Sequence, residues 1–310
     1  MNAREWLEHG GARSGDGVAL AVLGAPVARA SISRSRAQLT PAAFRAGLTR
    51  FSTFDGDHAV DLDELAVLDL GDVEGDAGDD DASAAHARVQ AAVAGAGARA
   101  PVVVVIGGDN SVTRPAMCGL AGGDLVEDWG LLTFDAHHDV RPPVDGPRNG
   151  TPVRDLIELG LPGERVAQIG IHGFANAAGH ARWARDRGVH VRRAAEVRSS
   201  GMPRVLDEVL DVLDRQGVRR LYVDIDMDVL DRAFAPACPA SMPGGLDPAQ
   251  LQEAAHLLGA DPRVRGVDLT EVDAAADIAG ATVRCMGSVF LAFCAGLVQR
   301  RRGVAAALGA

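Results

Sequence analysis

The stretch TFDAHHD, residues 133–139, joins an apolar run to a group of side chains that commonly bind metals. Residues 130–134 predict a short buried strand of a parallel sheet, because they are apolar nearly throughout. Asp135, His137 and Asp139 follow at alternate positions, so an extended chain places them on one face. Ligands of open α/β sheets bind just beyond the carboxyl ends of the strands. The stretch therefore predicts a divalent-cation site, although a solvated loop is an equal interpretation of this stretch alone.

A second strand end carries a similar row of acids. Residues 219–223 predict another strand, and Asp224, Asp226 and Asp228 follow it at alternate positions. Three carboxylates on one face repel one another, so the row is costly unless a cation neutralises it. A metal shared between the two strand ends removes that repulsion. The two rows together favour a metal site over two solvated loops.

The rest of the chain alternates strand-like and helical patterns. Further strands are predicted at 18–24, 65–71, 101–106, 166–171, 189–192 and 264–269, and helices at 41–50, 84–94, 176–187, 203–215, 248–258 and 281–300. Thr40 is the predicted N-cap of the first of these helices, with Pro41 as its first residue. The alternation is typical of one mostly parallel sheet flanked by helices on both faces. We therefore predict a single three-layer α/β domain over residues 1–310, with residues 1–17 as a loosely held lead-in.

Composition narrows the class of protein. The chain has 310 residues, of which 47% are hydrophobic and 4% aromatic, so its core must rely on Ala, Val and Leu. A net charge of −11 and a pI near 5.2 argue against nucleic acid or an anionic membrane as partner. The chain has no run of about 18 apolar residues, so no membrane span is predicted. The first residues lack the apolar segment of a signal peptide. The cysteines have no CxxC spacing, which favours reduced thiols in a cytoplasmic protein.

Several motifs occur along the chain in one order. They are GGDNS at 107–111, DAHHD at 135–139, NGTP at 149–152, DMDVLD at 226–231 and LTEVD at 269–273. This order resembles the ureohydrolase superfamily, which comprises arginase, agmatinase and formimidoylglutamase, and the resemblance runs from about residue 31 to the last helix. It implies an arginase-like fold, a binuclear manganese hydrolase of amidine or guanidine substrates, and a homo-oligomer.

The resemblance also implies a set of metal ligands. They are Asn110, Asp135, His137, Asp139, Asp226 and Asp228. Asp135 and Asp226 would bridge two Mn²⁺ ions, although the ligand types alone leave Mg²⁺, Zn²⁺ and Fe²⁺ open. Asn110 stands where the family normally has the histidine of a GGDHS motif. A neutral carbonyl oxygen is a weaker ligand than imidazole, so we expect one of the two ions to be held weakly.

Residues near the metals acquire roles by the same resemblance. Glu271 would pair with the cationic C–N centre of the substrate, against the alternative of an ordinary strand-end salt bridge. The leaving amine needs a proton, and Asn149 occupies the substrate-side position where arginase-like enzymes have a histidine. Asp139 or the metal-bound water is therefore the predicted proton donor. Of the remaining polar neighbours, His138 should face away from the metals, and Asp231 is expected in a turn.

The substrate's tail is predicted from one arginine. Arg141 follows the predicted ligand Asp139 at same-face spacing, and Arg suits bidentate capture of a carboxylate. The stretches DAHHDVR and NGTPVR, at 135–141 and 149–154, resemble formimidoylglutamases more than arginases. They imply hydrolysis of N-formimidoyl-L-glutamate to L-glutamate and formamide, a step of histidine degradation. The alternative is that Arg141 pairs with a local acid such as Asp145.

Two rival functions follow from the same residues. An agmatinase or another guanidino-acid hydrolase would share every metal motif and differ in tail recognition, where arginines of the loop 31–36 are further candidates. A degenerate ureohydrolase would keep the fold as a binding module, and Asn110 and Asn149 favour that reading. The five charged or imidazole ligands count against it, because a protein without metal would not need so much clustered negative charge.

Overall fold

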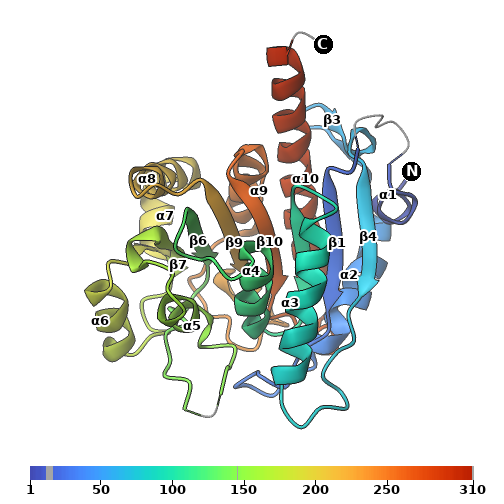
Figure 1. The fold of residues 1–310 in the computed structure, drawn as a ribbon. Helices are drawn as coiled ribbons and strands as arrows, with labels where there is room; N and C mark the ends of the chain where they lie inside the picture. The colour runs from blue at the N-terminus through green and yellow to red at the C-terminus, as the bar shows by residue number, and fades with distance from the viewer. Residues whose placement is uncertain (12–16, 145, 309–310) are drawn as a thin grey trace.

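The computed structural model describes residues 1–11, 17–144 and 146–308, which form an eight-stranded sheet between helices (Figure 1). The strand order is β4-β1-β5-β10-β9-β6-β7-β8, and neighbouring strands pair in parallel throughout. The strands are β1 (Leu20–Ala25), β4 (Val67–Asp72), β5 (Val103–Gly107), β6 (Trp129–Phe134), β7 (Val166–Ile171), β8 (His190–Arg193), β9 (Arg220–Asp226) and β10 (Val264–Thr270). The predicted parallel α/β domain is confirmed. Outside this sheet, β2 (Phe54–Asp55) and β3 (Val60–Asp61) form a small antiparallel hairpin.

Helices cover both faces of the sheet and bury two separate apolar clusters. The helices of one face are α1 (Ala3–His9), α2 (Thr40–Gly47), α7 (Ala194–Ser200), α8 (Met202–Arg215), α9 (Pro248–Ala260) and α10 (Ala281–Leu308). Those of the other face are α3 (Ser83–Gly97), α4 (Thr113–Ala121), α5 (Pro152–Glu158) and α6 (Ala178–Asp186). The architecture therefore has three layers, as the sequence predicted.

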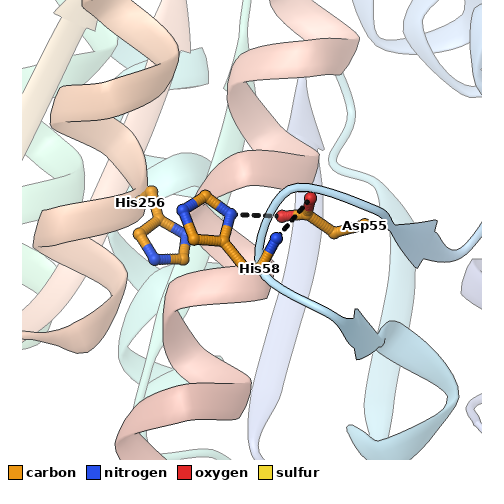
Figure 2. A group of neighbouring side chains, drawn as sticks. All are labelled: Asp55, His58 and His256. Atoms are coloured by element: carbon orange, nitrogen blue, oxygen red, sulfur yellow. Dashed lines mark hydrogen bonds and ion pairs between the residues drawn. The ribbon is translucent and has the colours of Figure 1, made fainter.

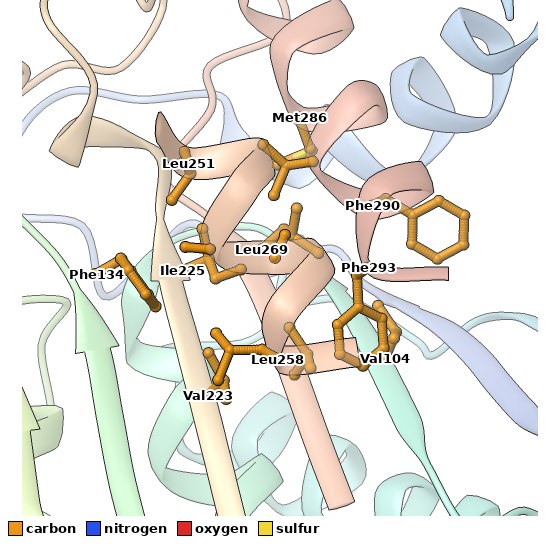
Figure 3. Close-up of a cluster of buried hydrophobic side chains, with 14 of the residues drawn as sticks. Val104, Phe134, Val223, Ile225, Leu251, Leu258, Leu269, Met286, Phe290 and Phe293 are labelled. Atoms are coloured by element: carbon orange, nitrogen blue, oxygen red, sulfur yellow. The ribbon is translucent and has the colours of Figure 1, made fainter. Parts of the chain in front are cut away.

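The central strand β5 is apolar at every position because it contributes side chains to both clusters. Val104 and Ile106 of β5 belong to the cluster beneath α9 and α10, whereas Val103 and Val105 belong to the cluster beneath α3 and α4. This alternation follows the period of two in an extended strand. Figure 3 shows the first cluster, in which Phe293 of α10 lies among sheet residues and side chains of α9. Aliphatic side chains supply most of both clusters.

The amino terminus differs from its prediction as a loosely held lead-in. Residues 3–9 form α1, whose N-cap Asn2 makes a capping box with Glu5. Trp6 is fully buried, and its indole N–H donates to the carbonyl of Leu65 at 3.4 Å. The prediction was wrong for these residues because a helix this short gives little periodicity, and contacts with distant residues fix it. Residues 12–16 of the predicted lead-in lie outside the described part of the chain.

Other local predictions also need correction. The N-cap of α2 is Leu39 and not Thr40, whose hydroxyl instead donates to the carbonyl of Val272. The short helices α4, α5 and α7 were not predicted. They follow turn-like sequence, where tertiary packing decides between helix and loop.

The last helix, α10, contains a stretch that resembles a membrane span in length and composition. Residues Ala281–Val304 are long and apolar enough to cross a bilayer, but 67% of the window is buried within the protein. That burial comes from packing on α9 and α2, as expected for a core helix. All four cysteines are free thiols.

We expect Trp6→Ala to lower the free energy of unfolding by about 3–5 kcal/mol, because it leaves a large cavity under α1. Urea unfolding followed by circular dichroism measures the change. Phe174→Ala is the matched control, since Phe174 is 93% exposed and its removal should change stability by less than about 0.5 kcal/mol. Equal effects of the two substitutions would contradict the assignment of α1 to the core.

Candidate active site

The predicted site residues meet at the carboxyl ends of four adjacent strands. Asn110 follows β5, Glu271 follows β10, Asp226 ends β9, and Asp135 follows β6, in the order of the sheet. Asp226 and Glu271 line a cavity of about 90 Å³ together with the neighbouring His137, Asp139 and Asp228. Residues up to 161 positions apart in the sequence are thus hydrogen-bonded here. The parallel sheet produces this convergence, because it places all its strand ends at one edge.

Two groups of side chains in this cavity are arranged to hold metal ions. Asp135, His137 and Asp228 form one group, and Asp135, Asp139 and Asp226 form the other, with the ligand atoms of each group within 4.8 Å of one another. Asp135 belongs to both, and its Oδ2 is buried without a hydrogen-bond partner among the described residues. A buried carboxylate oxygen without a partner is costly, so this oxygen fits a ligand that Asp135 shares between the two groups. Asp226 belongs to one group only, so bridging by Asp226 stays a prediction.

The buried acids oppose one another's charge. Burial, reinforced by Asp139 and Asp228, raises the pKa of Asp135 well above its ordinary value. Burial and the charge of Asp228 likewise raise the pKa of Asp226 well above its ordinary value. For His137, burial favours the neutral ring, but Asp228 and Asp135 outweigh it and raise its pKa to about 12. The cluster therefore needs positive charge, which a metal ion would supply.

The side-chain amide of Asn110 is oriented by its polar neighbours. Its Nδ2 donates to Asp139 at 2.9 Å and to Asp224 at 3.4 Å. Its Oδ1 accepts from the hydroxyls of Thr270 at 2.7 Å and Thr113 at 3.1 Å. Carboxylates only accept when ionised, so they fix which end of the amide faces the acids. In this orientation Asn110 supports Asp139 through its amide N–H. Direct binding of Asn110 to a metal stays a prediction.

Glu271 is held in the cavity by two donors. Its Oε1 accepts from the backbone N–H of Asn110 at 2.7 Å and from Nδ2 of Asn149 at 2.9 Å. Burial, together with the charge of Asp109, raises the pKa of Glu271 to about 8. Within the described ranges no arginine or histidine is ion-paired with Glu271, so the alternative of a strand-end salt bridge is not supported. Glu271 and Asp139 both have positive φ, 65° and 52°, which is backbone strain of the kind stored at functional sites.

Asn149 links this acid to the loop at the mouth. Its Oδ1 accepts from the backbone N–H of Ile32 at 2.9 Å, while its Nδ2 donates to Glu271. Ile32 and Ser33 line the cavity, whereas the exposed Arg34 and Arg36 do not. The loop was therefore placed correctly, but the structure does not bring its arginines into the cavity.

Arg141 is exposed and lines the same cavity. Its backbone N–H donates to the carbonyl of Gly150 at 3.0 Å, and its side chain runs past Gly150. An added Cβ at Gly150 would lie 2.8 Å from Cδ of Arg141, so the arginine side chain would have to shift to make room for it. No described carboxylate forms an ion pair with Arg141, and the alternative partner Asp145 lies outside the described residues.

The nearby polar residues support the ligands from behind. His138 faces Gln168, with Nδ1 2.7 Å from Oε1, so it points away from the metals as predicted. Asp231 accepts from the backbone N–H groups of Ala233 and Gly244 and belongs to a turn, also as predicted.

Sequence reasoning missed two polar residues of the cavity. Asn176 accepts from the N–H of His138 at 2.9 Å and donates to the carbonyl of Ala136 at 2.9 Å. These two bonds fix the backbone path of residues 135–139. His180 of α6 lines the cavity, and its pKa is lowered by burial and by Arg141. Both residues lie about 40 positions after residues 135–139 in the sequence. No local pattern marks them, because α6 reads as an ordinary surface helix.

The sequence profile of the arginase family matches residues 18–295. The chain belongs to the arginase family. It is similar to a formimidoylglutamase of Halalkalibacterium halodurans, 38% identical over 277 residues, which cover 89% of this chain and 86% of that protein. The solved structure of Bacillus subtilis formimidoylglutamase matches with a TM-score of 0.84 and 30% identity over 92% of this chain and 89% of that one. Trypanosoma cruzi formiminoglutamase, solved with Mn²⁺, matches with a TM-score of 0.83 and 27% identity over 93% and 96%.

Membership of the arginase family confirms the resemblance drawn from the ordered motifs, and the arginase-like fold with it. The carboxylate and imidazole groups at the strand ends are candidate ligands for the divalent ions that such a fold holds.

We expect Asp226→Asn to abolish most Mn²⁺ binding while leaving the metal-free protein at least as stable as the parent. The substitution removes a charge from a buried row of acids, so the repulsion that a metal normally relieves becomes smaller. Calorimetric titration with Mn²⁺ and thermal unfolding in chelator measure the two effects. Full metal binding by the variant would contradict the assignment. So would a loss of metal-free stability as large as that of a core truncation.

Proposed function

We propose that this arginase-family protein hydrolyses N-formimidoyl-L-glutamate to L-glutamate and formamide, as a cytoplasmic step of histidine degradation carried out by a homo-oligomer. The observation that carries the proposal is one cavity with acids at its base and a guanidinium at its mouth. Glu271 suits a cationic amidine head, Asp226 and Asp228 suit metal ions beside it, and Arg141 suits an anionic tail. The names of the similar proteins of H. halodurans and B. subtilis support the same substrate.

We propose two Mn²⁺ ions as the cofactor. Asp135, His137 and Asp228 would hold one, and Asp135, Asp139 and Asp226 the other. Hard carboxylate oxygens with a single imidazole suit Mn²⁺. Two bound ions of this kind supply an activated water and stabilise negative charge on the reacting centre.

The chain's own residues bind and orient the head of the substrate. Glu271 pairs with the amidinium, and the donors Asn110 and Asn149 keep its carboxylate turned into the cavity. An aligned carboxylate holds the C–N centre in one orientation, and this orientation lowers the barrier to reaction beyond the effect of charge attraction on binding. Asp139 lines the cavity, and its pKa is raised by burial to about 6. We propose that Asp139, beside the reacting centre, passes a proton to the leaving amine.

The tail of the substrate distinguishes this proposal from a guanidino-acid hydrolase. The arginines and histidines in the described lining of the cavity are Arg141, His137 and His180, and His137 belongs to the metal groups. Because the pKa of His180 is lowered, Arg141 is the cation left to meet a carboxylate. Formamide release marks the proposed reaction, whereas urea release would mark a guanidino substrate.

We expect Arg141→Ala to lower kcat/KM for N-formimidoyl-L-glutamate roughly ten- to a hundredfold. A charge-assisted contact with a carboxylate is worth about 1.5–3 kcal/mol, at about 1.4 kcal/mol per factor of ten. Arg141→Lys should recover part of the loss, since an ammonium lacks the planar fork. The assay compares this substrate with formamidine, which has no carboxylate and should be hydrolysed equally by parent and variant.

Arg34→Ala is the matched control, because Arg34 is an exposed arginine of the mouth loop that does not line the cavity. It should change neither rate by more than about twofold at physiological salt, where exposed charges are screened. If Arg141→Ala slowed both substrates equally, the dicarboxylate assignment would fail.

We expect Glu271→Gln to slow both substrates, and by a similar factor of about 10²–10³ in kcat, because it removes the charge that meets the common amidinium head. Mn²⁺ content should stay at the parent value, which separates Glu271 from the proposed ligands. Single-turnover rates with metal analysis test this. A variant that discriminated between the two substrates would place Glu271 at the tail instead.

A further inference from the structure

A second cluster of potential ligands lies outside the catalytic cavity. Asp55 and His58 belong to the hairpin formed by β2 and β3, and His256 belongs to α9, which packs beside it (Figure 2). None of the three lines the cavity described above. They line a separate and larger cavity of about 820 Å³.

The three side chains are already close together. One potential ligand atom from each lies within 4.8 Å of the other two. Nδ1 of His58 is 2.8 Å from Oδ2 of Asp55. The rings of His58 and His256 stack, with centroids 3.6 Å apart and planes 12° apart. Segments about 200 residues apart in the sequence thus bring two imidazoles and a carboxylate to one point.

His256 presents a buried lone pair at this point. Its Nε2 lies 3.1 Å from Oε1 of Gln299, and an amide oxygen can only accept, so Nε2 carries the hydrogen. Nδ1 is then the unprotonated nitrogen. It is buried and has no hydrogen-bond partner among the described residues, in a side chain that is 7% exposed. Metal-binding histidines are commonly held in this way, with the second ring nitrogen donating to a fixed acceptor.

We propose that Asp55, His58 and His256 form a second metal site, for a borderline transition-metal cation such as Zn²⁺. Two imidazoles and one carboxylate suit Zn²⁺ better than Mn²⁺, whereas the catalytic cavity is rich in carboxylates and suits Mn²⁺. The two sites would therefore select different metals.

One adjustment is required for binding. A ring nitrogen directs its lone pair in the plane of the ring, so two stacked parallel rings cannot both point at one ion. The side chain of His58 is 39% exposed and sits in the hairpin loop, so it has room to turn once its contacts with Asp55 and His256 rearrange. His256, fixed by Gln299, keeps its place. Rotation of His58 about its side-chain bonds replaces the stacking contact with a metal bond.

The surroundings favour a cation and its neutral ligands. The lining of the cavity includes Asp57, Asp247 and Glu253 and no arginine among the described residues. Burial and the neighbouring His58 lower the pKa of His256, which keeps its ring neutral and able to bind a metal. Since β2 and β3 have two residues each, the hairpin has few hydrogen bonds of its own. A bound ion would tie it to α9.

The test measures Zn²⁺ bound per chain by equilibrium dialysis of the Mn²⁺-loaded protein and of His58→Ala. We expect the parent to bind one more Zn²⁺ per chain than the variant, and Zn²⁺ to raise the melting temperature of the parent more than that of the variant. Any exchange of Zn²⁺ into the catalytic cavity is common to both proteins and cancels in the difference. His58 is exposed in a loop, so the variant should fold and keep the parent's hydrolytic rate with Mn²⁺.

Asp57→Asn is the matched control, because it removes a charge from the same loop without removing a proposed ligand. It should keep the additional Zn²⁺. Diffraction from Zn²⁺-soaked crystals at the zinc absorption edge should place an anomalous peak between Asp55, His58 and His256. The proposal is overturned if His58→Ala binds as much Zn²⁺ as the parent, or if Asp57→Asn loses as much as His58→Ala.

Discussion

Repulsion between buried carboxylates is the constraint on which this structure depends. Asp135, Asp226 and Asp228 are each 1–3% exposed and lie at the ends of adjacent strands, where neither water nor distance weakens their interaction. The sheet holds them there through its two apolar clusters, so they cannot move apart. His137 offsets part of the charge, and a divalent cation would offset more. The fold thus stores an unfavourable arrangement that becomes favourable when metal binds.

A frame of neutral amides orients the acids around that centre. Asn110 donates to Asp139 through its side chain and to Glu271 through its backbone, and Asn149 donates to Glu271 while holding Ile32 of the mouth loop. By resemblance, these asparagines stand where relatives often have histidines. The exchange removes potential positive charge from the cavity and replaces it with fixed hydrogen bonds. The amide dipoles of the two asparagines therefore position the acids, and a bound cation would neutralise their charge.

Much of the fold could be predicted because period and composition are local properties. The run 101–106 is apolar at every position and the run 166–171 at every position but Gln168, as expected for strands buried on both faces, and each matches an observed strand closely. The order of the strands could not be read in this way, since pairing joins β5 to β10 and β9 to β6 across long sequence separations. Helix α1 was missed for a related reason: Trp6 is held by Leu65 and Phe290, not by its neighbours in sequence.

For the site, the sequence by itself determined which acids follow the strands. The period of two grouped Asp135 with His137 and Asp139, and Asp226 with Asp228. The backbone is not extended there, because Asp139 has a φ of 52° and Met227–Val229 form a short 3₁₀ helix, so the loops and not strand alternation bring these side chains together. Only the tertiary structure decided the direction of Asn110, because two acids and two threonines from four different segments select the orientation of its amide. It alone brought His180 to the cavity and His58 to His256. Contacts between distant segments depend on how strands and helices pack, and no local pattern records that.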